Sequence, residues 1–463
     1  MLEKKHSRKG VFKLDVKENN NGQLRRQLKL IHVIAIGIAY MSPFAVFDTF
    51  GIASDASRGY VPASYLVVFT AILFTALSYG KLVKMFPISG SVYTYTRKIM
   101  NPYIGVLVGW VTFIAYLALP MINALLANIY LSSGFPTIPE AVWVIGLIAV
   151  ITIFNIFGVK ITASINILLV IFQFLVGTIF IYLNIRTINS DGVHQFITLQ
   201  SLFPANMEMS PLLAGAALLA LSFIGFDAIT TLSEETINPR KNIPKAILIV
   251  ATIGGVFFFT VTYFMQSLFP DVSVFQDIEG ASPEIAYIIG GNFFLSLFIS
   301  GALVSVFASG LAAQLSASRL LFAMGRDKVI PKSFFGYISP KQNTPILNII
   351  LVGILALSAL FLDLETATSL INFGAFTAFS FVNLCVIISF LKTKQARTAG
   401  NIISNIIAPC LGLIFIIYLW INLDLFSIII GLIWTGLGII YLAFTTNLFK
   451  SPPPEIKFEE LDM

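Results

Sequence analysis

Apolar runs of about 20 residues recur along the whole chain and leave few folds open to it. A helix of that length crosses the roughly 30 Å of hydrocarbon in a bilayer. The runs are continuous, without the polar–apolar alternation of a membrane β-strand. We therefore expect an all-α membrane protein with about 12 transmembrane helices, near residues 31–54, 61–85, 104–133, 140–159, 164–185, 212–233, 243–268, 293–325, 345–362, 366–391, 402–422 and 424–446.

Lysine and arginine are unevenly divided between the two sides that these spans define. If both termini are cytoplasmic, all but two of the 29 Lys and Arg residues lie inside, the exceptions being Arg58 and Arg186. This asymmetry follows the positive-inside rule and predicts a multi-pass protein of the plasma membrane. Anionic lipid explains the basic balance, so we expect no nucleic-acid partner. The predicted division is a cytoplasmic tail at 1–30, a transmembrane domain at 31–446 and a second cytoplasmic tail at 447–463.

Two aspartates, Asp48 and Asp227, lie inside apolar spans where a carboxylate is costly. An acidic side chain at the bilayer centre costs about 2.5–3.5 kcal/mol, so it is seldom present without a cation or proton to bind. Helix-breaking residues precede both acids, Ser42 and Pro43 in the first span and Ser222 and Gly225 in the sixth. Interrupted helices with polar groups at the break form substrate sites in many transporters. The pattern indicates a carrier for a small cation.

The two acids occupy similar Phe-Asp phrases in spans that run in opposite directions, as an inverted repeat would place them. Coincidence is the alternative, because the shared phrase is short. Each acid would lie near the N-terminus of a second half-helix, where free N–H groups favour an ionised carboxylate. Two carboxylates about 4 Å apart repel by roughly 4 kcal/mol at an effective dielectric of 20 and would disfavour a substrate carboxylate. We therefore predict a diamine held by Asp48 and Asp227, with simple helix capping as the alternative for either acid.

Other side chains in these spans complete a predicted substrate site. Aromatic rings can pack on a methylene chain and face an ammonium group. With Ser42 at the first break, the candidates are Tyr40, Phe44, Phe47, Phe223 and Phe226, although ordinary core packing explains such rings equally well. Polar residues in the third span either line the path or tie helices together. These are Tyr116, Asn123 and Asn128, with Pro120 among them.

A gate is predicted where the sixth and third spans reach the cytoplasm. Glu234 and Glu235 precede a basic stretch at 240–245, which suits a salt-bridge latch, with ordinary interfacial ion pairs as the alternative. Tyr93, in the phrase 90–95, is either part of an inner gate or of an aromatic belt, and we favour the belt.

Patterns for metal, nucleotide and covalent chemistry are missing from the sequence. His6, His32 and His194 have no metal-ligand partner at helical spacing. The chain has no glycine-rich phosphate loop, and no nucleophile lies with a base at membrane depth. We therefore expect no cofactor, no metal and no enzymatic activity. The energy for transport must then come from an ion gradient or from exchange.

Several phrases resemble the amino acid–polyamine–organocation superfamily of permeases, over residues 25–446. They are Phe-Pro and Gly-Ser within 86–91, Gly-Phe-Asp at 225–227, Glu-Glu-Thr to Ile-Pro-Lys at 234–245, and Ser-Arg-Leu-Leu through Met-Gly-Arg-Asp at 318–327. Within that superfamily, the phrases at 46–52, 119–123, 225–236, 269–271 and 366–375 look most like those of bacterial putrescine importers.

The resemblance implies a LeuT-type 5+5 inverted repeat with spans 1 and 6 broken and two extra helices. Substrate would bind between the first, third, sixth, eighth and tenth spans. The resemblance also implies proton-coupled uptake of putrescine, with an amino acid as the alternative substrate. Many relatives carry Glu at the position of Asp227, and the shorter Asp would leave room for substrate. Some proton-coupled relatives have a fifth-span lysine where this chain has Gln173, so the coupling proton would instead ride on Asp227 or Asp48.

Overall fold

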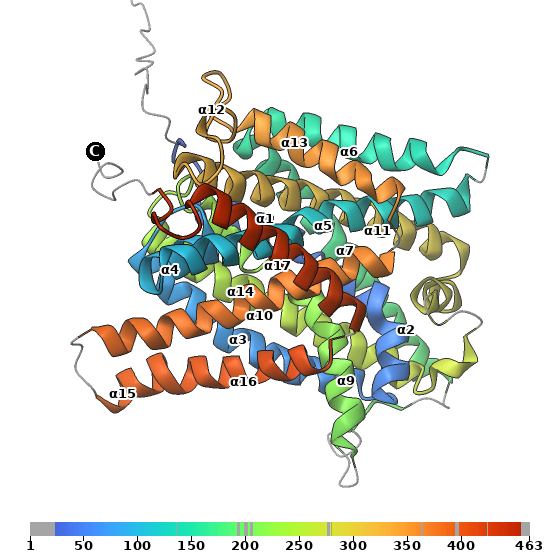
Figure 1. Cartoon of the computed structure of the whole chain (residues 1–463). Helices are drawn as coiled ribbons and strands as arrows, with labels where there is room; N and C mark the ends of the chain where they lie inside the picture. The colour runs from blue at the N-terminus through green and yellow to red at the C-terminus, as the bar shows by residue number, and fades with distance from the viewer. Residues whose placement is uncertain are drawn as a thin grey trace, which may run out of the picture.

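The structure is a computed structural model that describes residues 24–454, except 136, 192–194, 199–201, 204–206, 276–277, 279, 363, 394–397 and 424. His6, His194 and most of both predicted tails lie outside the described residues. Within them the chain is helical, and its one β-type contact is an isolated bridge between Leu28 and Thr236. Most helices lie side by side in one bundle (Figure 1).

The described residues of the first half of the chain form nine α-helices and two 3-10 helices. In chain order the elements are α1 (Leu30–Met41), α2 (Ala45–Ser57), α3 (Val61–Met85), α4 (Ser91–Ile99), α5 (Pro102–Gly134), α6 (Glu140–Ile156), α7 (Val159–Asp191), α9 (Met209–Leu219), η1 (Ala220–Phe223), η2 (Ala228–Leu232) and α10 (Pro239–Leu268).

The second half continues the bundle and ends with two peripheral helices. Its elements are η3 (Val272–Val274), α11 (Ala281–Arg326), α12 (Lys332–Phe335), α13 (Ile346–Ala356), η4 (Leu357–Leu360), α14 (Leu364–Lys392), α15 (Ala399–Ile402), the π-helical turn η5 (Ile403–Ile407), α16 (Ala408–Ile421) and α17 (Leu425–Thr445). The long α11 contains a kink at Gly291, whose φ is 64°.

Ten helical segments of the described chain are long and apolar enough to cross a membrane. They match ten of the predicted spans. The predicted spans at 140–159 and 345–362 coincide with shorter apolar helices, Glu140–Ile156 and Ile346–Leu360. The all-α prediction is confirmed for the described residues, whereas the count of twelve spans stays a prediction.

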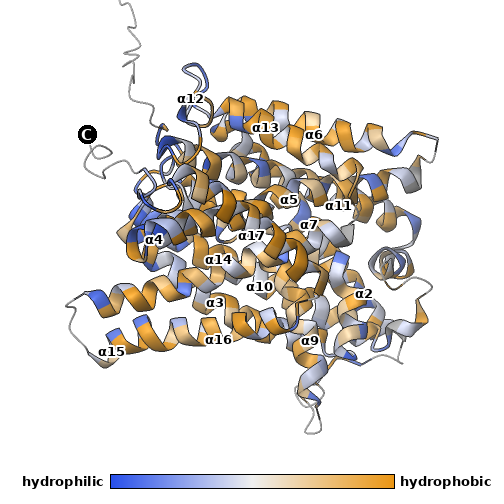
Figure 2. Cartoon of the chain, in the orientation of Figure 1, coloured by the Kyte–Doolittle hydropathy of each residue, from blue (hydrophilic) through white to orange (hydrophobic). Residues whose placement is uncertain are grey.

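Packing distinguishes a central group of helices from a peripheral one. Helix α10 runs along α3, and α5 lies against both α11 and α14. Most of α1 is buried, whereas α17 exposes large apolar side chains such as Phe444 at 81%. Apolar residues run along the helices, and polar residues gather at their ends (Figure 2). These exposed apolar side chains are expected to face the hydrocarbon of a membrane.

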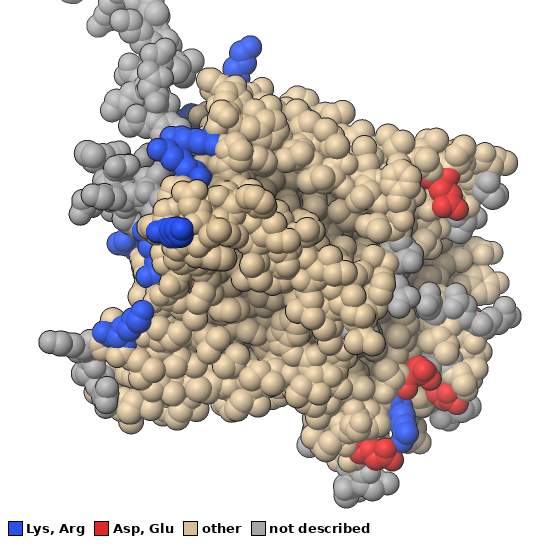
Figure 3. All heavy atoms as spheres, viewed as in Figure 1, with Lys and Arg blue, Asp and Glu red and all other residues tan. Residues whose placement is uncertain are grey.

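Charge divides the molecule into two ends. Lys and Arg gather on one side, near α4 and α12, and Asp and Glu gather on the other (Figure 3). We call the first the basic end, which includes Lys84, Lys98 and Lys332, and the second the acidic end, which includes Glu140 and Glu208.

Candidate functional site

The first span is broken between α1 and α2. Ser42 adopts a positive φ of 55° and ends α1 by donating its N–H to carbonyl oxygens of the last turn. Pro43 then has no N–H with which to continue the helix. The Ser42 and Ser305 hydroxyl oxygens lie 2.5 Å apart, and Ser309 donates to the carbonyl oxygen of Tyr40 at 3.2 Å. Two hydroxyls of α11 therefore satisfy polar groups at the break, as a span buried in protein requires.

The sixth span is broken after η1. Ile224 is extended, with φ −63° and ψ 129°, and Gly225 follows with φ 123°. That value lies in a region that residues with a Cβ rarely adopt. A Cβ at Gly225 would also collide with the Tyr40 ring, so the two breaks pack directly on each other. Both predicted breaks, in spans 1 and 6, are therefore present.

The segment after the second break is a 3-10 helix rather than the expected α-helical half. Thr230, Thr231 and Ser233 each donate their hydroxyl to the carbonyl oxygen three residues earlier, at 2.7, 2.6 and 2.5 Å. Such local bonds compete with the α-helical pattern and favour the tighter turn. Asp227 immediately precedes η2, and Asp48 lies in the first turn of α2.

A cavity of about 220 Å³ lies beside the two breaks, and we call it the central cavity. Its volume is below the roughly 300–1,000 Å³ of pockets for drug-sized ligands, which fits a small solute. Its walls come from α1, α2, α5, α9, η1, α11 and α14. They are Tyr40, Met41, Ser42, Ala45, Asp48, Thr49, Ile52, Leu119, Ile122, Asn123, Leu126, Leu218, Leu221, Ser222, Ile224, Val306, Ser309 and Thr368.

Asp48 is the only charged side chain among the described residues that line the central cavity. Its Oδ1 accepts a hydrogen bond of 2.5 Å from the Tyr130 hydroxyl on α5. Asp48 lies in the first turn of α2, where the positive end of the helix dipole favours the negative charge. Asp48 is thus an anion held in position at the wall of a small, mostly apolar space.

Asp227 is 2% exposed and is not part of the cavity wall. Its Oδ2 accepts hydrogen bonds from Tyr116 at 2.8 Å and Tyr79 at 3.4 Å, and its Oδ1 accepts one from the Gly225 N–H at 3.3 Å. Tyr40 lines the cavity and packs edge-on against Tyr116, with ring centroids 6.3 Å apart. The two acids are therefore not in one open space, and this aromatic pair lies next to Asp227.

The predicted aromatic residues divide between the cavity and the core. Tyr40 reaches the cavity, whereas Phe44 and Phe47 pack on each other with ring centroids 5.0 Å apart. Phe223 packs on Phe258, and Phe226 packs on Phe379, each pair with centroids 5.4 Å apart. The structure does not bring these four phenylalanines into the cavity wall, because neighbouring rings already occupy their faces.

The polar residues of the third span take different positions. Asn123 lines the central cavity and also donates its amide to Ser309 at 3.1 Å. Tyr116 reaches Asp227, and Asn128 donates to Glu140 at 3.1 Å on the neighbouring α6. Pro120 lies inside α5. The sequence left two roles open for these residues, lining the substrate path or joining helices. Asn123 does both, because it lines the cavity and connects α5 to α11.

At the basic end, five side chains form a continuous polar cluster, which we call the inner cluster: Glu234, Asp327, Arg326, Arg97 and Tyr93. Arg326 pairs with Glu234 at 2.5 Å and with Asp327 at 3.5 Å. Tyr93 donates to Asp327 at 2.8 Å and accepts from Arg97 at 2.5 Å. Burial, followed by the Asp327 charge, holds the pKa of Tyr93 well above its usual range, so the phenol stays protonated. The cluster ties the segment after η2 to α4 and α11.

Arg97 also connects the inner cluster to the end of the described chain. Its Nη2 donates to the carbonyl oxygens of Pro453, at 3.2 Å, and Pro454. Tyr103 at the start of α5 donates to the carbonyl oxygen of Phe449 at 3.2 Å. The segment after α17 therefore lies against the basic end.

A second ion pair beside this cluster is completely buried. Glu235 and Arg319 are both 0% exposed, and Arg319 binds both carboxylate oxygens, through Nη2 at 2.8 Å and through Nε. The backbone carbonyl of Glu235 accepts from Gln27 and Leu28, at 2.8 and 2.9 Å. The pair thus joins α11, the end of the sixth span and the segment before α1.

Gln173 is fully buried on α7, and neither amide atom has a hydrogen-bond partner among the described residues. Sequence reasoning missed other polar residues of the site, among them Tyr79, Tyr130 and Arg319. The tyrosines gave no signal, because single tyrosines are common in apolar spans. Arg319 did give one, as an arginine inside an apolar run that needs a partner.

These features define a class of protein: a multi-pass membrane carrier. Two interrupted helices meet at a small cavity whose described wall carries a single acid, and buried ion pairs connect the helices at the basic end. The family comparison agrees, because the amino acid permease family profile matches residues 32–445. The chain belongs to this family of permeases, which confirms the relationship implied by the sequence motifs.

Several relatives are similar over nearly their whole length. The low-affinity putrescine importer PlaP of Escherichia coli K12 is 42% identical over 435 residues, which cover 94% of this chain and 96% of PlaP. The branched-chain amino acid permease BcaP of Bacillus subtilis is 25% identical, covering 96% of this chain and 98% of BcaP. The methylthioribose transporter of the same species is 24% identical, covering 92% and 95%.

Proposed function

We propose that this protein is a secondary active transporter that imports putrescine, a small diamine, across the plasma membrane by alternating access. The observation that carries the proposal is Asp48, the single charged group among the described residues on the wall of the central cavity. An anion in a small apolar space attracts a cation strongly, because little water is present to screen it. The similarity to a putrescine importer over 94% of the chain supports the same substrate class.

In this proposal the two ammonium groups bind in sequence rather than in one open pocket. Asp48 takes the first ammonium from the cavity. The second reaches Asp227 when Tyr40 moves, and the phenols of Tyr79 and Tyr116 then share the carboxylate with it. The Tyr40 hydroxyl is buried and has no hydrogen-bond partner among the described residues, so no hydrogen bond opposes this movement.

The driving force we propose is an inward proton gradient. Gln173 cannot carry a positive charge at the fifth span. A proton on Asp227 would neutralise the empty carrier during its return, when no ammonium group is bound. The charge distribution supports cytoplasmic termini, because the basic end faces the cytoplasm under the positive-inside rule (Figure 3). In this proposal the ion pairs at the basic end form a seal on the cytoplasmic side, so substrate enters the central cavity from the outer side.

An amino acid is the second candidate substrate, because BcaP shares 25% identity with this chain. An amino acid would present a carboxylate to the same cavity. Asp48 would repel that carboxylate, whereas both ends of a diamine are attracted. A requirement for a free α-carboxylate in competition experiments would favour the amino acid.

The proposal is tested by uptake of radiolabelled putrescine into proteoliposomes, with butylamine and ornithine as competitors and an acid-outside gradient. Loss of one charge-assisted hydrogen bond, about 1.5–3 kcal/mol, predicts that Asp48→Asn raises the KM for putrescine about 10–150-fold. Asp227→Asn should stop accumulation driven by the gradient. Asp55→Asn is the matched control, because Asp55 is an exposed acid on the same α2. Wild-type KM in Asp48→Asn, or uptake indifferent to the gradient, would overturn the proposal.

A further inference from the structure

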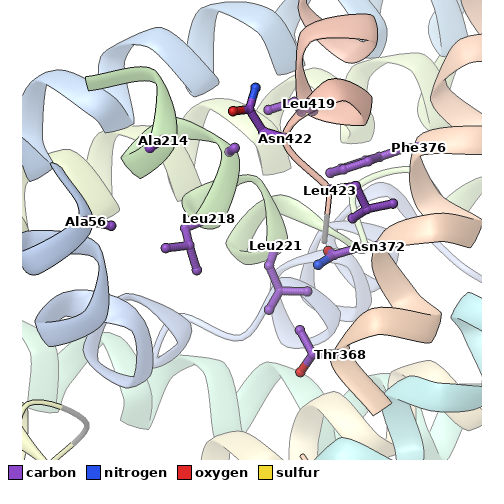
Figure 4. Close-up of a pocket in the computed structure, with 11 residues that line it drawn as sticks. Ala56, Ala214, Leu218, Leu221, Thr368, Asn372, Phe376, Leu419, Asn422 and Leu423 are labelled. Atoms are coloured by element: carbon purple, nitrogen blue, oxygen red, sulfur yellow. The ribbon is translucent and has the colours of Figure 1, made fainter. Parts of the chain in front are cut away.

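A second cavity adjoins the central cavity, and we call it the outer cavity (Figure 4). Its volume is about 350 Å³, and its walls come from α2, α9, η1, α14 and α16. Leu218, Leu221 and Thr368 line both cavities. These three side chains are therefore the boundary between the two spaces.

The walls of the outer cavity combine an apolar surface with uncharged acceptors. Leu218 of α9 and Leu221 of η1 face Asn372 of α14 across the space, and Asn422, which directly follows α16, lies at its edge (Figure 4). The Asn372 amide makes no hydrogen bond within the described part of the chain. The Asn422 amide nitrogen donates to the Tyr418 carbonyl oxygen at 2.8 Å, which leaves its Oδ1 available. Such walls suit a methylene chain that ends in a hydrogen-bond donor.

Two wall residues of the outer cavity, Thr368 and Asn372, belong to one of the phrases that resemble putrescine importers. They lie four residues apart on α14, so both project from the same face of the helix. Of the phrase 366–375, Thr368 is the one residue that lines the central cavity within the described chain. The outer cavity accounts for a further polar residue of that phrase, Asn372.

We propose that the outer cavity is a second amine subsite, which takes the distal half of an α,ω-diamine longer than putrescine. This inference rests on the proposed function, because it anchors the first ammonium at Asp48. The methylene chain then crosses the boundary at Leu218, Leu221 and Thr368. The distal ammonium donates to the amide oxygens of Asn372 and Asn422. A bound long diamine keeps this boundary open, and it therefore inhibits a carrier that must close before it can turn over.

The experiment measures inhibition of labelled putrescine uptake by α,ω-diamines of increasing chain length in proteoliposomes. Once the chain passes the boundary, each added methylene should lower the inhibition constant about 2–4-fold, as burial of apolar surface predicts. The same long diamines, when labelled, should not accumulate. Inhibition constants that stay flat or rise with chain length overturn the inference. Absence of any putrescine uptake by the wild type overturns the proposed function as well.

Two variants locate the effect in the outer cavity. Ala217→Phe fills that cavity from α9, and Asn372→Leu removes an acceptor without closing the space. Each should lower the preference for the longest diamine over putrescine at least about 5-fold, a change worth one buried polar contact. Leu213→Phe is the control, since Leu213 lies on α9 and lines neither cavity. An unchanged preference in both variants, or an equal loss in the control, refutes the subsite.

Discussion

Removing the charge of Glu235 should open the seal at the basic end and destabilise the protein. Glu235 and Arg319 are both 0% exposed, and each carboxylate oxygen accepts from a different guanidinium nitrogen. Glu235→Gln keeps the shape of the side chain. Whichever way the new amide is turned, its NH2 group faces an Arg319 N–H, so two donors meet and one hydrogen bond is lost. The substitution also leaves a buried guanidinium without an anion. Breaking one side of a buried pair costs about 3–5 kcal/mol.

The assay is thermal unfolding of the purified protein in detergent. For a chain of 463 residues, the entropy of unfolding corresponds to about 1 °C per kcal/mol, so Glu235→Gln should lower Tm by about 3–5 °C. Glu208→Gln is the control, because the Arg58–Glu208 pair is 66% and 64% exposed at 2.7 Å. Its loss should cost less than about 1 kcal/mol.

A double variant separates loss of charge balance from loss of packing. Glu235→Leu combined with Arg319→Met replaces the pair by apolar side chains and should recover most of the lost stability, since such replacements are often neutral. Equal Tm values for Glu235→Gln and Glu208→Gln would refute the reasoning. So would a double variant that is less stable than Glu235→Gln, because packing would then explain the effect.

Three further outcomes follow from single contacts. Tyr130→Phe removes the hydroxyl that donates to Asp48 at 2.5 Å and should raise the KM for putrescine about 2–12-fold, which uptake kinetics will measure. Gly225→Ala places a Cβ at a φ of 123° and against the Tyr40 ring, so it should abolish folding or uptake. A size-exclusion profile like that of the wild type together with normal uptake would contradict this. A lysine in Arg97→Lys cannot donate to both Tyr93 and the Pro453 carbonyl oxygen as the guanidinium does, so proteolysis of the chain after α17 should become faster. Lys98→Arg is the control and should leave the rate of proteolysis unchanged.

The membrane class, the helical spans and the two breaks could be read from the sequence because each depends on a local property. The length of an apolar run fixes whether it can cross hydrocarbon. A serine–proline pair or a glycine interrupts a helix wherever it occurs, as at 42–43 and 225. The 3-10 form of the segment after Asp227 was not predicted, because it depends on three hydroxyls acting together at 230, 231 and 233.

The site was predicted less completely, because a sequence does not fix how each helix is rotated in the bundle. The sequence placed Asp48 and Asp227 together, and the structure puts Asp48 on the cavity wall and Asp227 under the hydroxyls of Tyr79 and Tyr116. Successive residues of a helix turn by about 100°, so a small rotation moves a side chain from cavity to core.

Local chemistry alone therefore specified a helical membrane protein that carries two acids at two interruptions, and it pointed to a cationic solute. The three-dimensional packing settled which acid lines the cavity, that Tyr130 donates a hydrogen bond to it, and that Arg319 pairs with Glu235 at the basic end. These contacts join residues more than 80 positions apart, at separations where periodicity and helix-breaking signals carry no information. Only the folding of distant helices against one another brings them together.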